Sequence, residues 1–521
     1  MPTTLLGGKM GRKILFITTD QMRFDALGCN GGKVAMTPAI DALARDGINY
    51  TRAHAQSVVC MPARSTMLTG QYVSTHGVWM NGVPLPEDAP SVAAYLNENA
   101  NYKTALIGKA HFEPFLDLDL KFYENRMAHI GENGPHRGFD HMELASHTSL
   151  ILHYNKWMKE NAPKEIGGFY QNMNARFEVN AEGGGDTGAC QVHVNPVARE
   201  HYHTDWVADR TNAWLGSLDD DDDWFCWMSF PDPHHPWDPP ASETHRVNWR
   251  DLDLPDAYPA TRDQTKKILQ GKPKHWMWYW TGERTINIEA PPAFTPQDMT
   301  PDQVREVNAM THIENELIDE ACAKVFALIK ERGWEDDTDI IFTTDHGEFQ
   351  GDFGLLFKGP YHVESLMKLP FIWKPAKNAK VTASTVAAPV GQIDLAPTFC
   401  QIAGLNVPEW MQGSPLPQNE GEAKDQNRDR VFTEWDSVYT DGTEVSLRTL
   451  YHAGYIITAY NKTNIYEGTE GELYKLEDDP HQWNNLWDDP ASSKIKEELL
   501  LKLAEAHPPI REPKLDWVAI V

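Results

Sequence analysis

Short apolar runs recur along the chain, separated by stretches with helical periodicity. Residues 14–19, 224–230 and 339–344 are continuous runs of mostly apolar, aromatic and β-branched side chains. Such runs are typical of strands buried on both faces of a parallel sheet. Between residues 301 and 333 the apolar positions fall on one stripe, which predicts the longest helix of the chain. Further expected elements are helices over residues 91–100 and 205–218 and a strand that begins near residue 102.

The last hundred residues differ from the rest. From about Pro415 the sequence turns polar, which predicts a linker. Beyond it lie two short strand patterns, residues 431–435 and 455–460, and a terminal helix over residues 493–506. A chain of 521 residues is too long for one small core. We therefore expect two domains, over residues 11–415 and 416–521.

Composition limits the classes of partner. The chain has 47 lysine and arginine residues against 75 aspartate and glutamate residues, a formal net charge of −28. This charge argues against non-specific binding to nucleic acid or to an anionic membrane. No stretch is long and apolar enough for a signal peptide or a membrane span, which predicts a cytoplasmic protein without a membrane partner. The six cysteines are scattered, which favours neither a disulfide framework nor a structural zinc site.

The segment 58–70 holds the clearest chemistry. Pro62 suits the first turn of a helix, so Cys60 is expected at or just before a helix N-terminus. That end carries partial positive charge and free N–H donors, which suit an anion or an anionic nucleophile. Arg64 follows one turn later and is expected on the same side as Cys60. The simpler alternative is a buried cysteine that acts as a small core residue.

The pattern Cys60-x-Pro62-x-Arg64, followed by Leu-Thr-Gly at residues 68–70, resembles the signature of the type I sulfatases. The resemblance implies that a maturation enzyme oxidises Cys60 to formylglycine, and that the hydrate of this aldehyde is the nucleophile. One hydroxyl would take the sulfuryl group, and the other would lose a proton and expel sulfate. Arg64 would supply fixed positive charge at the site.

A second sulfatase signature, Gly-Tyr-x-Thr-x-x-x-Gly-Lys-x-His, is similar to residues 101–111, with Asn101 in place of the first glycine. It implies that Lys109 contacts the sulfate and that His111 holds one hydroxyl of the hydrate. Two residues apart on an extended chain, these side chains are expected to point to the same side. Asn81 resembles a substrate-binding asparagine of the related phosphonate monoester hydrolases, although a turn asparagine is equally compatible.

Aspartates stand at the ends of two predicted strands, where ligands gather in open α/β sheets. The resemblance implies one divalent cation held by Asp20, Asp345, His346 and the oxygen on residue 60. Gln21, where the family usually has a second aspartate, would assist. The imidazole ligand favours Mn²⁺, with Ca²⁺ and Mg²⁺ as alternatives. Without the family pattern, Asp20 would be interpreted as a helix cap or turn residue.

Two further groups are expected around the substrate. Residues 231–236 resemble the Pro-His-x-Pro segment of the family, in which the first histidine reaches the substrate. His234 would therefore contact the sulfate or protonate the leaving oxygen, while His235 is expected to be a neighbour without a catalytic role. Lys358, in a segment similar to the family's Gly-Leu-x-x-Lys, would bind a sulfate oxygen. Glu348 is expected to be a structural carboxylate.

The matches run in order from Lys13 to Leu486. They imply an alkaline-phosphatase-like α/β fold, with a large mixed, mostly parallel sheet flanked by helices and a small C-terminal domain of antiparallel sheet and helix. The implied activity is metal-dependent, arylsulfatase-like hydrolysis of small-molecule sulfate monoesters, which releases sulfate and an alcohol or phenol and is promiscuous towards related esters. The alternatives are a phosphonate monoester or phosphodiester hydrolase with the same nucleophile, and a catalytically silent metal-binding scaffold.

Three features stay open at this point. Residues 118–200 show few clear elements and are expected to form a substrate lid or an oligomer contact. The aromatic cluster of Trp276, Trp278, Tyr279 and Trp280 is expected to pack in the core or at a subunit interface, with an aryl-binding mouth as the alternative. The long insertions suggest a homo-oligomer, a dimer or a tetramer.

Overall fold

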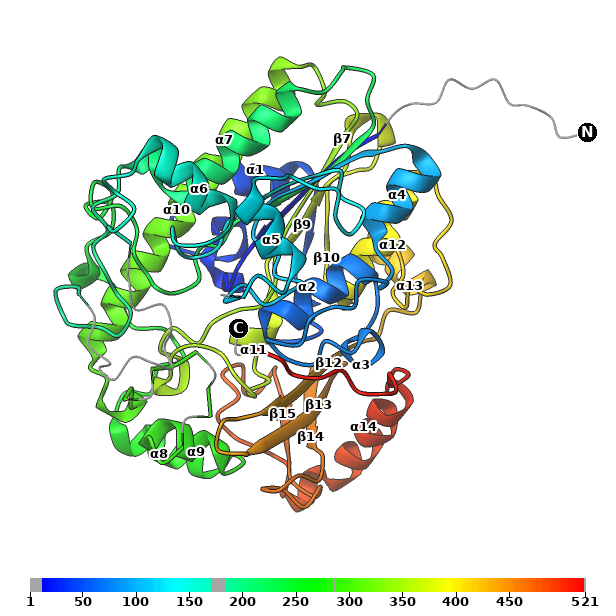
Figure 1. Cartoon of the computed structure of the whole chain (residues 1–521). Helices are drawn as coiled ribbons and strands as arrows, with labels where there is room; N and C mark the ends of the chain where they lie inside the picture. Colours follow the sequence, from blue (N-terminus) through cyan, green and yellow to red (C-terminus); the bar gives the residue numbers. More distant parts are fainter. Residues whose placement is uncertain are drawn as a thin grey trace, which may run out of the picture.

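In the computed structural model, an eight-stranded sheet forms the centre of a large domain (Figure 1). The structure describes residues 12–117, 119–169, 184–284, 286–287, 289–291 and 293–519. Among the described strands of this sheet, only the third in spatial order runs against the others. In spatial order the strands are β10 (Ser384–Val386), β2 (Ile48–Tyr50), β9 (Phe371–Lys374), β7 (Thr338–Thr344), β1 (Lys13–Thr19), β6 (Trp224–Ser229), β4 (Lys103–Gly108) and β5 (His141–Leu144).

The three apolar runs of the sequence form the middle of this sheet. They are the neighbouring parallel strands β7, β1 and β6, and every residue in them is buried. This confirms the prediction of strands covered on both faces. In the register, Thr18 of β1 lies opposite Thr343 of β7 and Ser229 of β6. The carboxyl ends of these strands therefore meet at one edge of the sheet.

Helices cover both faces of the large sheet. On one face, α10 (Pro301–Glu331) packs against α1 (Pro38–Asp46) and α7 (His203–Gly216), and on the other α2 (Cys60–Thr69) packs against α4 (Val92–Ala100) and α12 (Leu395–Ile402) (Figure 1). The predicted long helix is α10, which begins with a capping box between Thr300 and Gln303. No described helix is long and apolar enough to cross a membrane. The remaining helices are α3 (Val73–His76), α5 (Tyr123–Ile130), α6 (Leu152–Asn161), α8 (Arg262–Gln270), α9 (His275–Thr281), α11 (Glu364–Met367), α13 (Glu420–Asp425) and α14 (Ser493–Glu505).

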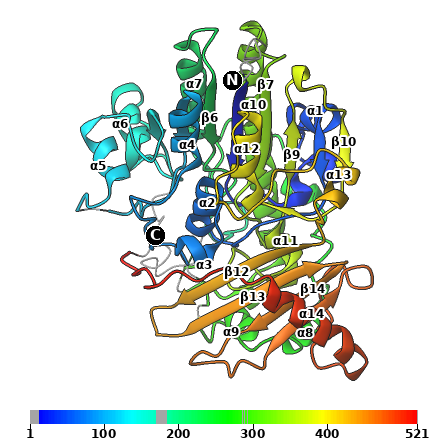
Figure 2. The ribbon, with the colours of Figure 1, turned by 90° about the vertical axis from the view of Figure 1, so that its right-hand side faces the viewer.

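Two smaller sheets join the large domain to the end of the chain. A three-stranded sheet has the order β11 (Val390–Gly391), β3 (Ala53–His54) and β8 (Lys368–Leu369). Below it, α14 packs on a four-stranded antiparallel sheet (Figure 2), which confirms the expected small domain of sheet and helix. That sheet has the order β12 (Arg430–Val438), β13 (Glu444–His452), β14 (Tyr455–Tyr460) and β15 (Gly471–Lys475).

Two details of the small domain differ from the prediction. Strand β12 extends to Val438, beyond the predicted end at residue 435, because the polar residues Asp436 and Ser437 continue the pairing with β13. The polar stretch after Pro415, predicted to be a linker, contains the short helix α13. Arg428 fastens this stretch to the large domain through Asp394.

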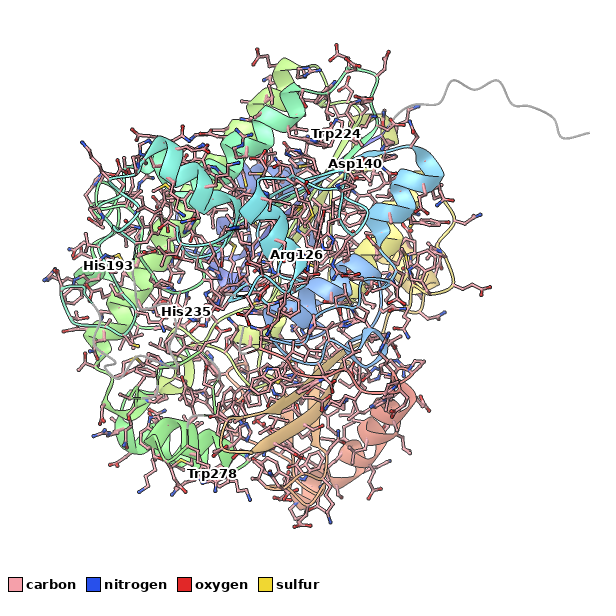
Figure 3. All side chains as sticks on the ribbon, in the orientation of Figure 1. Arg126, Asp140, His193, Trp224, His235 and Trp278 are labelled. Carbon is pink, nitrogen blue, oxygen red and sulfur yellow. The ribbon has the colours of Figure 1, made fainter. Side chains whose placement is uncertain are left out.

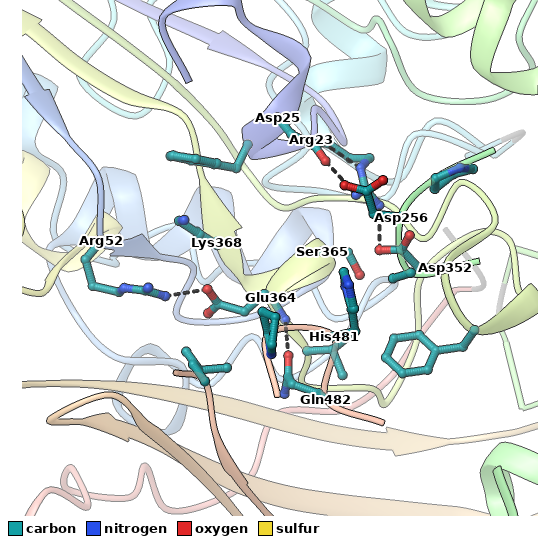
Figure 4. A pocket seen from close by; sticks show the side chains of 17 residues that line it. Arg23, Asp25, Arg52, Asp256, Asp352, Glu364, Ser365, Lys368, His481 and Gln482 are labelled. Atoms are coloured by element: carbon teal, nitrogen blue, oxygen red, sulfur yellow. Dashed lines mark hydrogen bonds and ion pairs between the residues drawn. The ribbon is translucent and has the colours of Figure 1, made fainter. Parts of the chain in front are cut away.

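A pocket of about 370 Å³ lies where the loop after β15 meets the large domain (Figure 4). Most of its charged side chains are paired with one another, as in the ion pairs Arg52–Glu364 and Arg23–Asp352. None of the described residues that line it is a site residue expected from the sequence. The pocket therefore lies between the large domain and the end of the chain, and it is separate from the candidate site.

Candidate active site

A polar side chain lies just beyond the carboxyl end of each of five neighbouring parallel strands, at the same edge of the large sheet. Asp345 follows β7, Asp20 follows β1, His234 follows β6, Lys109 follows β4 and His147 follows β5. All five side chains are buried. In open α/β sheets the carboxyl ends of the strands form the ligand-binding edge. The topology thus gathers residues that lie up to 325 positions apart in the sequence.

Four potential ligand atoms converge around Cys60. Asp20, Cys60, Asp345 and His346 each offer one atom, and these atoms lie within 4.8 Å of one another. The sulfur of Cys60 is 3.6 Å from Oδ1 of Asp20 and 3.3 Å from Nε2 of His346. Nδ1 of His346 is 2.9 Å from the carbonyl oxygen of Gly347, a contact that leaves Nε2 free to bind a cation. Burial lowers the pKa of His346, which keeps the imidazole neutral.

This donor set fits a divalent cation. Two carboxylates and one neutral imidazole are ligands that Mn²⁺ and similar ions accept. The fourth atom, the sulfur of Cys60, lies where a hydroxyl oxygen of formylglycine would be, since that modification replaces the thiol on the same carbon. The structure therefore brings together Asp20, Cys60, Asp345 and His346, the four main ligands that the sequence predicts. Their role as ligands stays a prediction.

Arg64 connects the two carboxylates of this group. Its Nε donates to Oδ2 of Asp345 at 2.9 Å, and its Nη2 lies 3.5 Å from Oδ2 of Asp20. Nη1 donates to the carbonyl oxygen of Lys109 and to Oγ of Ser229. Arg64 thus lies on the side of α2 that faces the candidate site, as its spacing from the helix start predicts.

Lys109 reaches Asp20 from the end of β4. Its Nζ binds Oδ2 of Asp20 and lies 2.8 Å from Nε2 of His147. The preceding Gly108 has a φ of +105°, and a Cβ there would lie 1.7 Å from the carbonyl oxygen of Ser229 in the neighbouring strand β6, so this position requires glycine. Burial alone would raise the pKa of Asp20, but Lys109 and other positive groups outweigh it and hold that pKa well below its usual range.

His111 does not have the predicted backbone conformation. Strand β4 ends at Gly108, and His111 has a φ of +59°, so the extended chain expected across Lys109 and His111 was wrong. Its ring packs on Phe115, with 4.9 Å between ring centroids. Neither ring nitrogen has a hydrogen-bond partner among the described residues. Burial, reinforced by Lys109 and Arg64, holds the pKa of His111 well below its usual range, so the ring is neutral.

Lys358, His234 and Glu289 form a second charged cluster beside Cys60. Nζ of Lys358 is 2.9 Å from Nε2 of His234 and also binds Oε2 of Glu289. Oε2 of Glu289 lies 3.1 Å from Nε2 of His234 and 3.2 Å from Nε2 of His235. Ligand atoms of Cys60, His234 and Glu289 lie within 4.8 Å of one another. Burial would raise the pKa of Glu289, but Lys358 and His234 outweigh it, so the carboxylate is ionised.

Gln21 lies between the two clusters. Its backbone N–H donates to Oδ1 of Asp345 at 3.0 Å. Its side-chain oxygen accepts from Lys358, while Nε2 donates to Glu348 and lies 3.2 Å from Nδ1 of His235. The side chain of Gln21 is thus engaged with the Lys358 cluster, and its part in metal binding stays a prediction. Glu348 has the structural contacts expected of it, and burial raises its pKa to about 7.

Asn81 lies at the beginning of the helix that carries Cys60. Helix α2 begins at Cys60, as predicted. Oδ1 of Asn81 accepts from the backbone N–H of Met61 at 3.0 Å. Asn81 is 1% exposed, and its Nδ2 has no hydrogen-bond partner among the described residues. A free amide donor is therefore present near the nucleophile position.

The sequence interpretation missed His147 and Glu289. The ring of His147 stacks on His234 with 3.9 Å between centroids. Its position just after β5, a parallel strand, is a signal that could have identified it, but β5 has only four residues. Glu289 lies in irregular chain between α9 and α10, and no sequence signal marks it. The segment expected to form a lid or an oligomer contact, residues 118–200, thus contributes His147 to the site, although residues 118 and 170–183 of it lie outside the described residues.

The aromatic cluster after residue 275 packs in the interior. Trp276, Tyr279 and Trp280 are buried, and Nε1 of Trp276 donates to Glu472 of β15 at 3.2 Å. Trp278 lies at the lower edge of the molecule, well separated from His235 (Figure 3). The cluster therefore joins the large domain to the small sheet. This supports a role in packing rather than a role as an aryl-binding mouth.

Comparisons with known proteins identify the family of the chain. The family model described as Sulfatase matches residues 12–405, and the one described as N-sulphoglucosamine sulphohydrolase, C-terminal, matches residues 351–508. An uncharacterized sulfatase of Escherichia coli (strain K12) is 25% identical over 96% of this chain and 88% of its own length. An arylsulfatase of Clostridium perfringens (strain 13 / Type A) is 26% identical over 92% of this chain and 90% of its own. The crystal structure of the phosphonate monoester hydrolase of Agrobacterium radiobacter superposes with a TM-score of 0.77 at 23% identity, over 95% of this chain and 96% of that one.

Proposed function

The chain belongs to the sulfatase family and is a sulfuric ester hydrolase, and we propose that it cleaves sulfate monoesters with a nucleophile derived from Cys60. The alkaline-phosphatase-like fold expected from the sequence is confirmed. One observation carries the proposal: the sulfur of Cys60 lies within 4.8 Å of ligand atoms of Asp20, Asp345 and His346. The proposed nucleophile and the proposed cation site would therefore share one position at the start of a helix.

The surrounding side chains match the charge changes of sulfuryl transfer. Lys109 and Lys358 would each bind an oxygen of the sulfate, exchanging part of their present contacts with carboxylates for contacts with the substrate. Arg64 holds a fixed positive charge behind them. Preorganised charge of this kind stabilises the charge that develops on the transferring group. When the bond between sulfur and the leaving oxygen breaks, that oxygen takes up a proton. Burial holds the pKa of His234 well below its usual range, so the neutral ring would accept a proton from Lys358, whose Nζ lies 2.9 Å from its Nε2, and transfer it to the leaving oxygen.

The proposed cation and the formylglycine have distinct roles. A bound divalent cation would be held by Asp20, Asp345, His346 and residue 60, where it would lower the pKa of a hydroxyl and make attack possible at neutral pH. A hydroxyl on the carbon that now bears the sulfur of Cys60 would supply the attacking oxygen. The remaining residues orient the ester and keep the site buried.

The mass of the tryptic peptide from Ala53 to Arg64 tests the nucleophile. We expect a mass that matches formylglycine or its hydrate in a sample that hydrolyses an aryl sulfate. The Cys60→Ala variant, which cannot be matured, should lose this activity. An active sample in which the peptide carries only unmodified cysteine would refute the formylglycine. Hydrolysis that survives in the Cys60→Ala variant would remove Cys60 from the mechanism.

Phosphonate monoesters and phosphodiesters are a second candidate substrate class. Gln21 beside Asp20 resembles the phosphonate hydrolase branch, and its side-chain amide lies on Lys358. The free Nδ2 of Asn81 is a further donor for an ester oxygen. We therefore propose activity on both ester types, with the aryl sulfate preferred. Values of kcat/KM for an aryl sulfate and an aryl phosphonate ester, measured on one preparation, would rank the two classes.

Other expectations stay proposals of the same kind. They are Mn²⁺ as the cation, a formylglycine-generating maturation enzyme as a partner, a homo-oligomeric assembly and a cytoplasmic location. A silent scaffold is disfavoured because each group of the expected catalytic set is present and buried at the site. Metal analysis tests the identity of the cation, mass photometry tests the assembly, and cell fractionation tests the location.

A further inference from the structure

A segment after α14 returns to the active-site side of the large domain. Residues 507–519, red in Figures 1 and 2, run from α14 past α3 towards α2. The backbone N–H of Arg511 donates to the carbonyl oxygen of Ser74 at 2.8 Å. Further along, Nε1 of Trp79 donates to the carbonyl oxygen of Leu515 at 2.9 Å. The segment thus follows the loop between α3 and Asn81 over most of its length.

The segment ends its described course on Asn81 and Gly82. Nε1 of Trp517 donates to the carbonyl oxygen of Asn81 at 3.1 Å. The backbone N–H of Val518 donates to the carbonyl oxygen of Gly82 at 3.0 Å. Gly82 has a φ of +87°, and a Cβ there would lie 1.9 Å from the carbonyl oxygen of Ala519. Such a close approach of two backbones requires glycine.

The other side of this loop faces the nucleophile. Oδ1 of Asn81 accepts from the N–H of Met61, the residue after Cys60, at 3.0 Å. The N–H of Gly82 lies 3.1 Å from the sulfur of Met61. Asn81 is therefore held from two directions, by Trp517 through its carbonyl group and by Met61 through its side chain.

Asn81 has one polar group left over. Its Nδ2 is buried and has no partner among the described residues. A buried donor without a partner costs free energy, and a ligand that supplies an acceptor removes this cost. The position at the start of α2, where backbone N–H groups favour anions, suits an oxygen of a bound ester or of inorganic sulfate.

We propose that Trp517 is a positioning residue of the active site, which fixes Asn81 so that Nδ2 donates to the sulfate group of the substrate. The inference rests on the proposed function, because it takes Asn81 as a substrate donor. It adds that the binding strength of the site depends on a side chain 436 positions further along the chain. Trp517 acts through Asn81, so its contribution disappears when the side chain of Asn81 is removed.

A double-mutant cycle tests this coupling. Trp517→Phe removes the indole N–H and keeps an aromatic ring, and Asn81→Ala removes the proposed donor. We expect Trp517→Phe to lower kcat/KM for an aryl sulfate about 3- to 10-fold, which corresponds to one hydrogen bond. Asn81→Ala should lower it further, and the double variant should equal Asn81→Ala, because the two changes remove one interaction.

A matched control separates this effect from a general loss of an indole bond. Nε1 of Trp249 donates to Asp186 at 3.2 Å, and Trp249 is half-buried as Trp517 is. Trp249→Phe should leave kcat/KM within about twofold of the wild type. The mass of the Cys60 peptide and the Tm of each variant show that maturation and folding are unchanged.

Binding of inorganic sulfate, followed by calorimetry, gives a readout that needs no turnover. The same pattern is expected, with weaker binding in Trp517→Phe and in Asn81→Ala and no further loss in the double variant. Equal sulfate affinity in Trp517→Phe and the wild type would overturn the inference, as would effects of the two substitutions that multiply. A wild-type protein that binds sulfate with this pattern but hydrolyses no ester would overturn the proposed function and leave the positioning role of Trp517 supported.

Discussion

Arg64 donates a hydrogen bond from Nε to Oδ2 of Asp345 at 2.9 Å, and both side chains are fully buried. Burial would lower the pKa of Arg64, but Asp345 and Asp20 outweigh it and raise that pKa. The guanidinium is therefore charged at every working pH. It balances part of the negative charge of the two carboxylates without occupying the side of them that faces Cys60. A cation can then be bound without leaving the arginine unpaired.

Removal of Arg64 should affect both activity and stability. Arg64→Ala leaves Asp20 and Asp345 buried without their shared partner. Breaking a buried ion pair in this way costs about 3–5 kcal/mol of the free energy of unfolding. We expect urea denaturation to show this loss, and kcat/KM for an aryl sulfate to fall at least about 100-fold.

The control for Arg64 is Arg448. It is also mostly buried and pairs with Asp436 at 2.8 Å, but it belongs to β13 of the small sheet. Arg448→Ala should lower stability while the folded enzyme keeps its kcat. Full activity in Arg64→Ala would show that its charge is not used in the reaction.

His346 and His235 should differ in their effect on metal content. Nε2 of His346 lies 3.3 Å from the sulfur of Cys60, whereas both nitrogens of His235 contact Glu289 or Gln21. We expect the wild type to purify with about one divalent ion per chain, His346→Ala to lose most of it, and His235→Ala to retain it. Elemental analysis measures this, and a chelator should lower the Tm of the wild type. Equal metal content in both variants would exclude His346 as a ligand.

Glu289 should matter for rate rather than for metal binding. Its ionised carboxylate holds Lys358 and His234 in one cluster. Glu289→Gln removes the charge that orients both groups, and general acid–base catalysis contributes about 10²–10⁴-fold to enzymatic rates. We expect kcat to fall about 10- to 100-fold, with unchanged metal content.

A second buried carboxylate provides the comparison for Glu289. Glu472 of β15 binds Tyr460 at 2.7 Å and lies 3.4 Å from Lys272, at the contact between domains. Glu472→Gln should lower the Tm and leave kcat nearly unchanged. An equal loss of kcat in both variants would show that the Glu289 effect is structural and not specific to the site.

Residues at strand ends were predictable from the sequence because topology places them. Asp20, Lys109, His234 and Asp345 each follow an apolar run that is long enough to recognise. When these runs form neighbouring parallel strands, the residues that follow them lie together at one edge of the sheet. The family resemblance then supplied expected roles, and the structure brings these side chains together in two clusters.

The remaining parts of the site depend on contacts that no local pattern encodes. Glu289 lies in irregular chain, where neither periodicity nor a motif marks it. His111 has a left-handed backbone, which the alternation rule for an extended chain cannot anticipate. The hydrogen bond from the indole N–H of Trp517 to the carbonyl oxygen of Asn81 joins two segments that lie far apart in the sequence. This contact forms because the chain, after α14 of the small domain, runs back to the large domain.

The junction between the domains should weaken in mild acid. His275, at the start of α9, is fully buried, with Nδ1 2.6 Å from the hydroxyl of Tyr466 and Nε2 2.9 Å from the carbonyl oxygen of Pro360. Burial lowers the pKa of His275 to about 4, whereas a histidine in an unfolded chain has a pKa of about 6.5. Between these values the unfolded chain binds a proton that the folded protein does not. Stability therefore falls as the pH falls from about 6.5 towards 4.

The variant His275→Gln isolates this contribution, because glutamine can donate and accept hydrogen bonds but does not titrate. Between pH 7.5 and pH 5.0, the wild type should lose about 2 kcal/mol more of its free energy of unfolding than the variant does. Urea denaturation at both pH values measures the difference. At pH 7.5 the variant is expected to be the less stable of the two, since its amide cannot reproduce the packing of the imidazole ring on Tyr361. An equal loss in both proteins would place the acid sensitivity at other groups and would mean that His275 is protonated in the folded state.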